Sequence, residues 1–259
     1  MPEMLEVECY RLAADEVVGR KIASVRAPDD WFTKGETTPG LLAAVLPGRV
    51  VTRTRRIGKL LLLDTDGPVL GLRFGMTGRI VVDASAPIEV LEYSSDRDDP
   101  AWDRFGLEFV GGGSLAIRDP RRLGGVELDP DEARLGPDAG RVTRKPFGEI
   151  LTGSTAPLKA RLLDQARLAG LGNLLVDETL FRAGLAPHRP SASLTADELD
   201  RLHRVMRQTI ALLGTRGGSH TGDLQPARVR GGSCPRDATA LRRDVVGGRT
   251  TYWCPAHQY

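Results

Sequence analysis

The amino-terminal stretch MPEMLEVECYRL brings together residue types that can do chemistry, because Pro2, Glu3 and Glu6 lie at the very start of the chain. Carboxyl groups beside a reacting group can act as general acids and bases. Proline and acidic residues also favour the first turn of a helix. The stretch therefore has two interpretations, the start of a surface helix or an active site built on the chain terminus.

The end of the chain carries two pairs of potential metal ligands, CPRD (234–237) and CPAH (254–257), with a two-residue gap in each pair. Two such pairs on a hairpin are typical of a zinc ribbon. The predicted ligands are Cys234, Asp237, Cys254 and His257. Four cysteines would be a stronger signal, and a hairpin that keeps this shape without a metal is the alternative. In either case GGRTTYWC places Arg249 near the hairpin tip.

Two further segments have the character of DNA-contacting loops. In AGLGN (169–173), glycines allow the backbone to approach a ligand, and a helix N-terminus with Asn173 suits a phosphate. A tight turn between helices is the alternative. In RDPRRLGGVEL (118–128), paired arginines precede an exposed-looking Leu123, and such loops can push a side chain into a base stack.

The elements that must position these residues fall into two regions. Short apolar runs punctuated by Gly, Pro and Asp predict strands from about residue 21 to 128, in a β-sandwich. In the segment before them, Leu5, Cys9 and Leu12 recur at helical spacing, and we expect Cys9 in the core.

From about residue 130 helices are expected instead. Residues 158–168 have helical periodicity, and a second helix follows the AGLGN break. Thr195 and Glu198 form a capping-box pattern before a long helix that Gly214 ends. Its predicted buried stripe is Leu199, Leu202, Met206, Thr209 or Ile210, and Leu213.

The sequence has 259 residues, of which 41% are hydrophobic and 27% charged, as in ordinary globular proteins with two domains. No apolar run approaches the roughly 18 residues that a membrane span needs, and the acidic start is unlike a signal peptide. Three cysteines make no paired disulfide framework, so we expect a cytoplasmic protein. Net charge is only +2, but residues 216–259 hold seven arginines against three aspartates. Such a local basic patch suits a polyanion, and a solvated face is the alternative.

These pieces, in this order, resemble the formamidopyrimidine-DNA glycosylase and endonuclease VIII family of base-excision repair enzymes. The resemblance covers almost the whole chain. It is carried by MPEMLEVE (1–8), RRIGKLLLL (55–63), LRFGMTG (72–78), DPRRLGG (119–125), LLDQARLAGLGNLLVDETLFRAGLAPHRP (162–190) and GGRTTYWCPAHQ (247–258).

The resemblance implies a catalytic role for the terminus. Removal of Met1 would leave Pro2 with a free secondary amine, whose pKa of about 7.7–8.0 leaves far more neutral amine at neutral pH than a lysine has. Pro2 would then attack the sugar, expel the base and form an iminium that leads to β,δ-elimination. Glu3 would be the general acid and base, Glu6 would orient the sugar, and Lys59 would hold a phosphate or assist proton transfer.

The resemblance also implies a set of DNA contacts. Met76, Arg121 or Arg122, and Leu123 would fill the gap left by the flipped base, although Met76 as a plain core residue is the alternative. Lys159, Asn173 and Arg249 would bind phosphates that flank the lesion.

Four departures from the family pattern stand out. Leu5 replaces a proline, Leu123 replaces the wedge phenylalanine, and Asp237 and His257 replace zinc-ligating cysteines. The segment 216–232 is shorter than the loop that covers an oxidised purine in one branch, which favours a more open pocket. Oxidised pyrimidines or bulkier lesions would suit such a pocket.

The predicted fold is α+β. It comprises an N-terminal β-sandwich with flanking helices (1–130), a helix-two-turn-helix domain (131–216) and a zinc-finger-like β-hairpin (217–259). The predicted function is that of a bifunctional DNA glycosylase and abasic-site lyase, acting as a monomer on damaged double-stranded DNA near the bacterial nucleoid, with no membrane partner. The alternative is a catalytically inactive protein that recognises lesions or bends in DNA. A third possibility is an abasic-site lyase with little glycosylase activity.

Overall fold

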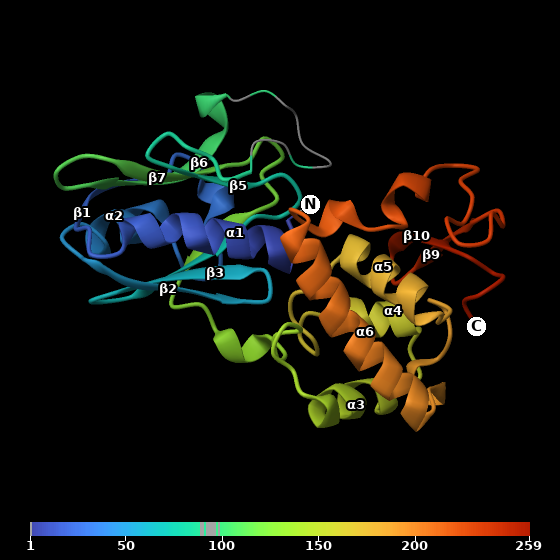
Figure 1. Ribbon diagram of the computed structural model, residues 1–259. Coiled ribbons are helices and arrows are strands. Elements are labelled where there is room, and N and C mark those ends of the chain that lie inside the picture. Colours follow the sequence, from blue (N-terminus) through green and yellow to red (C-terminus); the bar gives the residue numbers. More distant parts are fainter. Residues whose placement is uncertain (1, 89–90, 92–96, 98) are drawn as a thin grey trace. The chain divides into compact units, whose positions relative to one another are not determined.

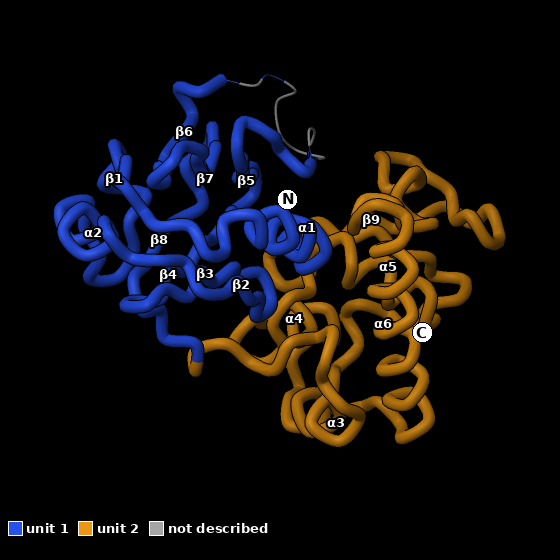
Figure 2. Tube along the Cα trace, turned by 60° about the vertical axis from the view of Figure 1, so that its left-hand side comes forward, with its two compact units in different colours: residues 1–132 blue, residues 133–259 orange. Residues whose placement is uncertain are grey.

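The computed structural model describes residues 2–88, 91, 97 and 99–259, and the chain forms two compact units, residues 1–132 and 133–259 (Figure 2). The first boundary lies close to the predicted one at residue 130. The hairpin predicted as a third domain lies within the second unit. Among the described residues, no helix has both the length and the hydrophobicity that crossing a bilayer requires.

The first unit is the predicted β-sandwich, made of two four-stranded antiparallel sheets (Figure 1). One sheet has the order β1-β6-β7-β5 and the other β2-β3-β4-β8. Leu61, Leu72, Phe105 and Ile117 belong to one buried core that both sheets share. The strands are β1 (Ile22–Arg26), β2 (Val51–Ile57), β3 (Leu60–Thr65), β4 (Val69–Arg73), β5 (Arg79–Val82), β6 (Asp103–Phe109), β7 (Ser114–Arg118) and β8 (Gly125–Leu128).

Helix α1 (Met4–Ala14) contacts β2, β3 and β5, so it packs against strands of both sheets. Its buried face was predicted wrongly. Leu12 is exposed and Cys9 only half-buried, whereas Val7, Tyr10 and Ala14 are fully buried. The stripe through Leu5, Cys9 and Leu12 was the obvious apolar one, but Tyr10 supplies more apolar surface and bonds the Gly78 carbonyl at 3.3 Å.

Among the described residues of this unit, one α-helix and one strand were not predicted. Helix α2 (Pro39–Val45) has its start signals in the sequence, since Thr38 accepts the Leu41 N–H at 3.1 Å and Pro39 follows. Strand β8 has only four residues and follows a glycine pair, so its sequence resembles the loop before it. Its ladder is with β4, and this long-range pairing defines it as a strand.

The second unit contains helices α3 (Arg144–Thr152), α4 (Leu158–Leu163), α5 (Asn173–Ala183) and α6 (Ala196–Thr215), with the hairpin β9 (Arg242–Val246) and β10 (Arg249–Trp253). The capping box and the buried stripe of α6 are confirmed. Helix α3 was not predicted.

The single helix predicted over 158–168 is wrong beyond Leu163. The Gln165 amide donates to the carbonyls of Leu163 and Leu171 and accepts the Gly170 N–H. Side-chain bonds of this kind compete with helical ones, so the chain turns here.

Candidate active site and DNA-contacting loops

The predicted catalytic carboxyl groups form the start of α1. Glu3 is the N-cap residue and Glu6 is at the third helical position, and the two form a capping box. The Glu6 carboxylate accepts the backbone N–H of Glu3 at 2.8 Å. Pro2 and Glu3 are both buried. The capping box therefore fixes the backbone at Glu3, directly after Pro2. The two interpretations of this stretch, a helix start and a catalytic terminus, are compatible because they involve the same residues.

Lys59 lies on the two-residue turn between β2 and β3, where Gly58 has a φ of +57°. This turn is tied to α1 through Arg56, which donates to the Gly58 carbonyl at 2.7 Å and to Glu8 at 2.8 Å. Burial would raise the pKa of Glu8, but hydrogen bonds from Arg56 and Arg11 outweigh it and lower that pKa. Helix α1 thus holds both the chain terminus and the lysine turn.

The segment that carries Met76 and the loop that carries Leu123 lie against one another. A Cβ atom on Gly75, which has a φ of +57°, would lie 2.4 Å from the carbonyl carbon of Leu123. Asp119 joins them, because its buried carboxylate accepts Thr77 Oγ1 at 2.6 Å and the N–H groups of Leu123 and Gly124 at 2.9 and 2.8 Å. Met76 itself is half-buried rather than part of the core.

The two arginines of this loop differ in their partners. Arg122 has a φ of +56° and binds both carboxylate oxygens of Asp29, at 2.6 and 2.5 Å. These bonds lower the pKa of Asp29. Arg121 is exposed, and its N–H donates to Asp119 at 3.2 Å. Leu123 is 49% exposed. The Arg122 guanidinium is therefore bound within the unit, whereas the Arg121 side chain extends at the surface of the loop.

In the second unit, the Thr250 carbonyl oxygen links the hairpin to the helices. Asn173 Nδ2 donates to it at 3.1 Å and Lys159 Nζ at 3.3 Å. Asn173 begins α5, directly after the N-cap residue Gly172. Arg249 begins β10 after the Gly247-Gly248 turn, near the hairpin tip, and its side chain is exposed. Because Thr250 follows Arg249, these contacts bring the arginine's backbone close to Asn173.

The structure corrects the role predicted for Lys159. Its side chain is 0% exposed and forms an ion pair with Asp177 at 2.6 Å. Arg228 pairs with the other oxygen of Asp177. A direct contact between Lys159 and a phosphate is excluded in this arrangement, because the ammonium group lies in the interior of the unit.

The four predicted metal ligands converge. One donor atom from each of Cys234, Asp237, Cys254 and His257 lies within 4.8 Å of the others. Cys234 Sγ is 3.7 Å from His257 Nδ1, Cys254 Sγ is 3.5 Å from Asp237 Oδ2, and that oxygen is 3.2 Å from His257 Nδ1. A tetrahedral ion with sulfur, nitrogen and oxygen ligands requires edges of about 3.3–3.8 Å. The cluster could therefore hold a metal ion.

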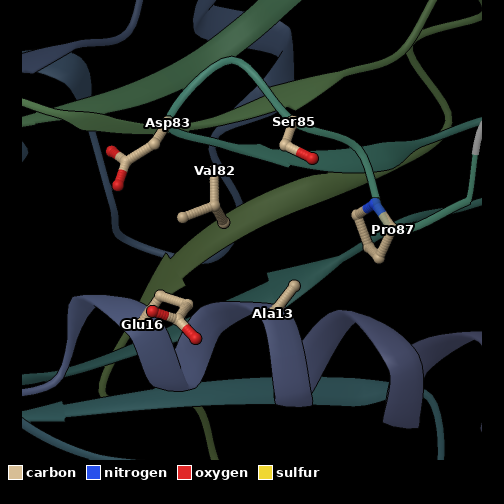
Figure 3. A pocket seen from close by; sticks show the side chains of 6 residues that line it. All are labelled: Ala13, Glu16, Val82, Asp83, Ser85 and Pro87. Carbon is tan, nitrogen blue, oxygen red and sulfur yellow. The ribbon is translucent and has the colours of Figure 1, made fainter.

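Sequence reasoning missed the carboxylates that hold these parts: Glu8, Asp29, Asp119 and Asp177. No local spacing marks them, because each binds at least one residue far away in the sequence: Arg56, Arg122, Thr77 and Lys159, respectively. A pocket of about 280 Å³ lies where α1 ends, beside the turn after β5 (Figure 3). It is lined by Ala13, Glu16, Val82, Asp83, Ser85 and Pro87, and none of the predicted site residues is among them.

Comparisons with known proteins agree with this geometry. The formamidopyrimidine-DNA glycosylase N-terminal domain matches residues 1–126, and the formamidopyrimidine-DNA glycosylase H2TH domain matches residues 135–222. The formamidopyrimidine-DNA glycosylases of Geobacillus kaustophilus and Streptococcus pyogenes are 35% and 33% identical. Both alignments cover the whole of this chain, with 100% and 98% of the relatives.

Solved structures of DNA glycosylases have a similar fold. Lactococcus lactis Fpg bound to abasic-site DNA has a TM-score of 0.82 at 27% identity, with both chains fully covered. The same enzyme bound to DNA containing N7-benzyl-Fapy-dG has a TM-score of 0.81 at 27% identity, over 99% of both chains. Fold and site thus define a DNA glycosylase of the helix-two-turn-helix class. The chain belongs to the formamidopyrimidine-DNA glycosylase family.

Proposed function

We propose that this protein excises damaged bases from duplex DNA in base-excision repair and then cleaves the abasic site through its terminal amine. The observation that carries the proposal is full-length similarity to named formamidopyrimidine-DNA glycosylases together with the intact Pro2-Glu3 start. Neighbours of the same fold were solved with damaged or abasic DNA. We further propose that the enzyme acts as a monomer and works at the bacterial nucleoid, where its DNA substrate lies.

In this mechanism, Pro2 is the nucleophile. After Met1 is removed, the lone pair of the Pro2 nitrogen forms a bond to C1′, and the bond from C1′ to the damaged base breaks. The base leaves with a proton, and the sugar opens to an iminium ion. Loss of a C2′ proton expels the 3′ phosphate, and a second elimination expels the 5′ phosphate. A terminal amine suits this step because about a third of it is unprotonated near pH 7.4.

Neighbouring residues would assist. Glu3 is the proposed acid that protonates the opening sugar, and general acid–base catalysis contributes about 10²–10⁴-fold. Glu6 holds the backbone N–H of Glu3, which supports a role in positioning that carboxyl group. Lys59, on a turn fastened to α1, is proposed to bind a phosphate of the lesion strand or to assist proton transfer.

The proposed DNA contacts follow the loops. Met76, Arg121 and Leu123 would fill the space left by the flipped nucleotide. Asn173 at the start of α5 and Arg249 at the hairpin tip would bind phosphates, since helix N-termini attract anions. For Lys159 we propose a positioning role in place of the predicted phosphate contact. It supports the Thr250 carbonyl and so positions the hairpin against the helices.

We propose zinc as the metal of the Cys234 cluster, since its mixed sulfur, nitrogen and oxygen ligands suit this ion. Zinc would brace the hairpin that carries Arg249 and take no part in the chemistry. Metal analysis of the purified protein should find about one zinc per chain. Chelation should lower the melting temperature, and Cys234→Ser should remove both the zinc and this response to chelator. A zinc-free wild type whose stability does not change with chelator would refute the assignment.

The deciding experiment is borohydride trapping on a duplex that carries an abasic site. The wild type should form a covalent protein–DNA band. Pro2→Gly should weaken this band strongly, and a variant with a Gly-Met extension before Pro2 should lose it, because the nitrogen becomes an amide. The absence of a band from protein whose Met1 is confirmed to be removed would favour the non-catalytic DNA-binding alternative. A trapped band without release of any damaged base would favour a lyase with little glycosylase activity.

A further inference from the structure

One tryptophan of the first unit is unusually exposed. Trp31 has 68% of its surface accessible, whereas Trp253 has 5%. Large aromatic side chains are costly to leave in water, and tryptophan is enriched where proteins contact their ligands. Trp31 belongs to a 3₁₀ turn, Asp30–Phe32, that lies between β1 and α2 and was assigned no role by the sequence.

This turn is fastened to the loop that carries Leu123. Asp29 accepts the Trp31 N–H at 3.2 Å, and the same carboxylate binds the Arg122 guanidinium. On the other side of the tryptophan, Phe32 is fully buried. A Cβ atom on Gly124 would lie 3.0 Å from the Phe32 ring. Residues on both sides of Trp31 therefore contact the loop from Arg122 to Gly124.

The segment after the tryptophan is fixed to the same region. Thr33 forms a parallel bridge with Val126 of β8, and the Lys34 N–H donates to the Val126 carbonyl at 2.9 Å. Lys34 Nζ lies 5.4 Å from the centre of the Trp31 ring and donates to the Trp31 carbonyl at 2.5 Å. These contacts fix the backbone on both sides of Trp31, whereas its ring is exposed to solvent.

The charged side chains near Trp31 favour a nucleic acid as the ligand of this surface. Lys34 lies beside the Trp31 ring, and the adjoining loop carries the exposed Arg121. The Arg122 guanidinium is bound to the Asp29 carboxylate and neutralises it, so Lys34 and Arg121 are the cations proposed to bind phosphates here. Asp30 is exposed, so the surface is not uniformly basic. A ring next to cations can stack on a base while the cations bind the adjacent phosphates. The surface is also continuous with the proposed wedge loop.

We propose that Trp31 is a second DNA-contacting residue, which stacks on a nucleotide of the duplex beside the Leu123 loop. The inference rests on the proposed role of that loop. It also explains how an aliphatic wedge can suffice, because Leu123 cannot stack as an aromatic residue does. Trp31 would contribute to binding and to opening of the base stack, with no part in the chemistry of Pro2.

The test uses a duplex with a tetrahydrofuran abasic analogue, which binds but cannot react. Intrinsic fluorescence of the wild type should be quenched by this duplex, and iodide should reach Trp31 less well in the complex. Trp31→Leu should lose most of the quenching and raise Kd about tenfold, as expected for one base–aromatic stack. Trp31→Phe should recover part of the affinity. Val110→Ala, which trims an exposed apolar residue beyond the end of β6, is the matched control and should bind as the wild type does.

An unchanged Kd in Trp31→Leu, or equal weakening in Val110→Ala, would overturn the inference. A Trp31→Leu protein with a lowered melting temperature would also overturn it, since the ring would then serve the fold. Borohydride trapping on reactive abasic DNA at saturating enzyme separates the two proposals. Wild type and Val110→Ala should trap equally there, whereas failure of the wild type itself would count against the proposed function alone.

Discussion

At the scale of single residues, the catalytic proposal gives Pro2 the role of nucleophile and Glu3 the role of general acid, and the two roles can be tested separately. Glu3→Gln removes the proposed acid but keeps a side chain of the same shape at the start of α1. Release of a damaged base should fall by about 10²-fold or more, because protonation of the sugar is lost. Trapping on a preformed abasic site should decline much less, since that sugar equilibrates with its open aldehyde form without help from an acid. Single-turnover assays on both substrates measure the two effects.

Glu16→Gln is the matched control, because Glu16 is exposed, follows α1 and lies outside the proposed site. It should leave both rates unchanged. Equal loss on both substrates in Glu3→Gln would show that Glu3 only maintains the helix start and would contradict its role as the acid.

The residues that could be predicted from sequence are those whose chemistry shows in their type and local spacing. Pro2 with Glu3, and the two ligand pairs at 234–237 and 254–257, are of this kind. Asp119 and Lys159 are not. The Asp119 carboxylate accepts the distant Thr77 hydroxyl as well as the nearby N–H groups of Leu123 and Gly124, and the burial of Lys159 depends on its partner Asp177. The family resemblance implied a phosphate contact for Lys159, and its buried ion pair with Asp177 has no signal in the local sequence.

At the scale of elements, Asp119 holds the Met76 segment and the Leu123 loop in one arrangement. Asp119→Asn would place an amide N–H against backbone donors and leave at least one of them unsatisfied. This costs about 1–3 kcal/mol of unfolding free energy. Excision of a damaged base should slow markedly, because both wedge segments lose their order. Thermal unfolding and excision assays measure the two effects.

Thr77→Val is the milder companion, because it deletes only one of the four donors to Asp119. It should cost about 1 kcal/mol and slow excision less. Trapping on a preformed abasic site at saturating enzyme should persist in both variants. If Asp119→Asn excises bases at the wild-type rate despite its lower stability, the carboxylate serves the fold alone.

The ion pair between Arg189 and Glu198, at the start of helix α6, should stabilise the fold in a pH-dependent way. Arg189 donates to both oxygens of Glu198, at 2.6 and 2.7 Å, and lowers the pKa of Glu198 to about 2. Because the folded pKa lies below the ordinary value of 4.5, the stabilisation is present above about pH 4.5 and is lost as pH falls toward 2. Glu198→Gln should cost about 1 kcal/mol at pH 7, because solvent screens this surface pair. Its melting temperature should approach that of the wild type near pH 2, and a constant difference would contradict the assignment.

Elements with their own start and stop signals were predictable, and those defined by partners were not. The strands of the sandwich show apolar runs in their sequences, and helix α6 shows both an apolar stripe and a capping box. Strand β8 exists because β4 pairs with it. Helix α4 ends early because Gln165 bonds its backbone. Apolar periodicity also misled at α1, where two faces compete and tertiary packing selects the one with Tyr10.

At the scale of the whole molecule, a net charge of +2 is too small to bring the protein to DNA, so the binding must depend on local contacts. Arg249 and Arg204 provide a direct comparison, because both are exposed and each alanine substitution removes one positive charge. Arg249 lies at the hairpin tip next to Thr250, whereas Arg204 lies on α6.

If a phosphate contact acts at the tip, Arg249→Ala should weaken lesion binding about tenfold at moderate salt. Its plot of log affinity against log salt concentration should lose about 0.9 of slope, the value for one released counterion. Arg204→Ala should change neither quantity, since net charge alone acts weakly through a Debye length of about 8–10 Å. Fluorescence anisotropy with the tetrahydrofuran duplex at several salt concentrations gives both numbers. Equal slopes in the two variants would mean that overall charge steers the binding, and Arg249 would lose its assigned contact.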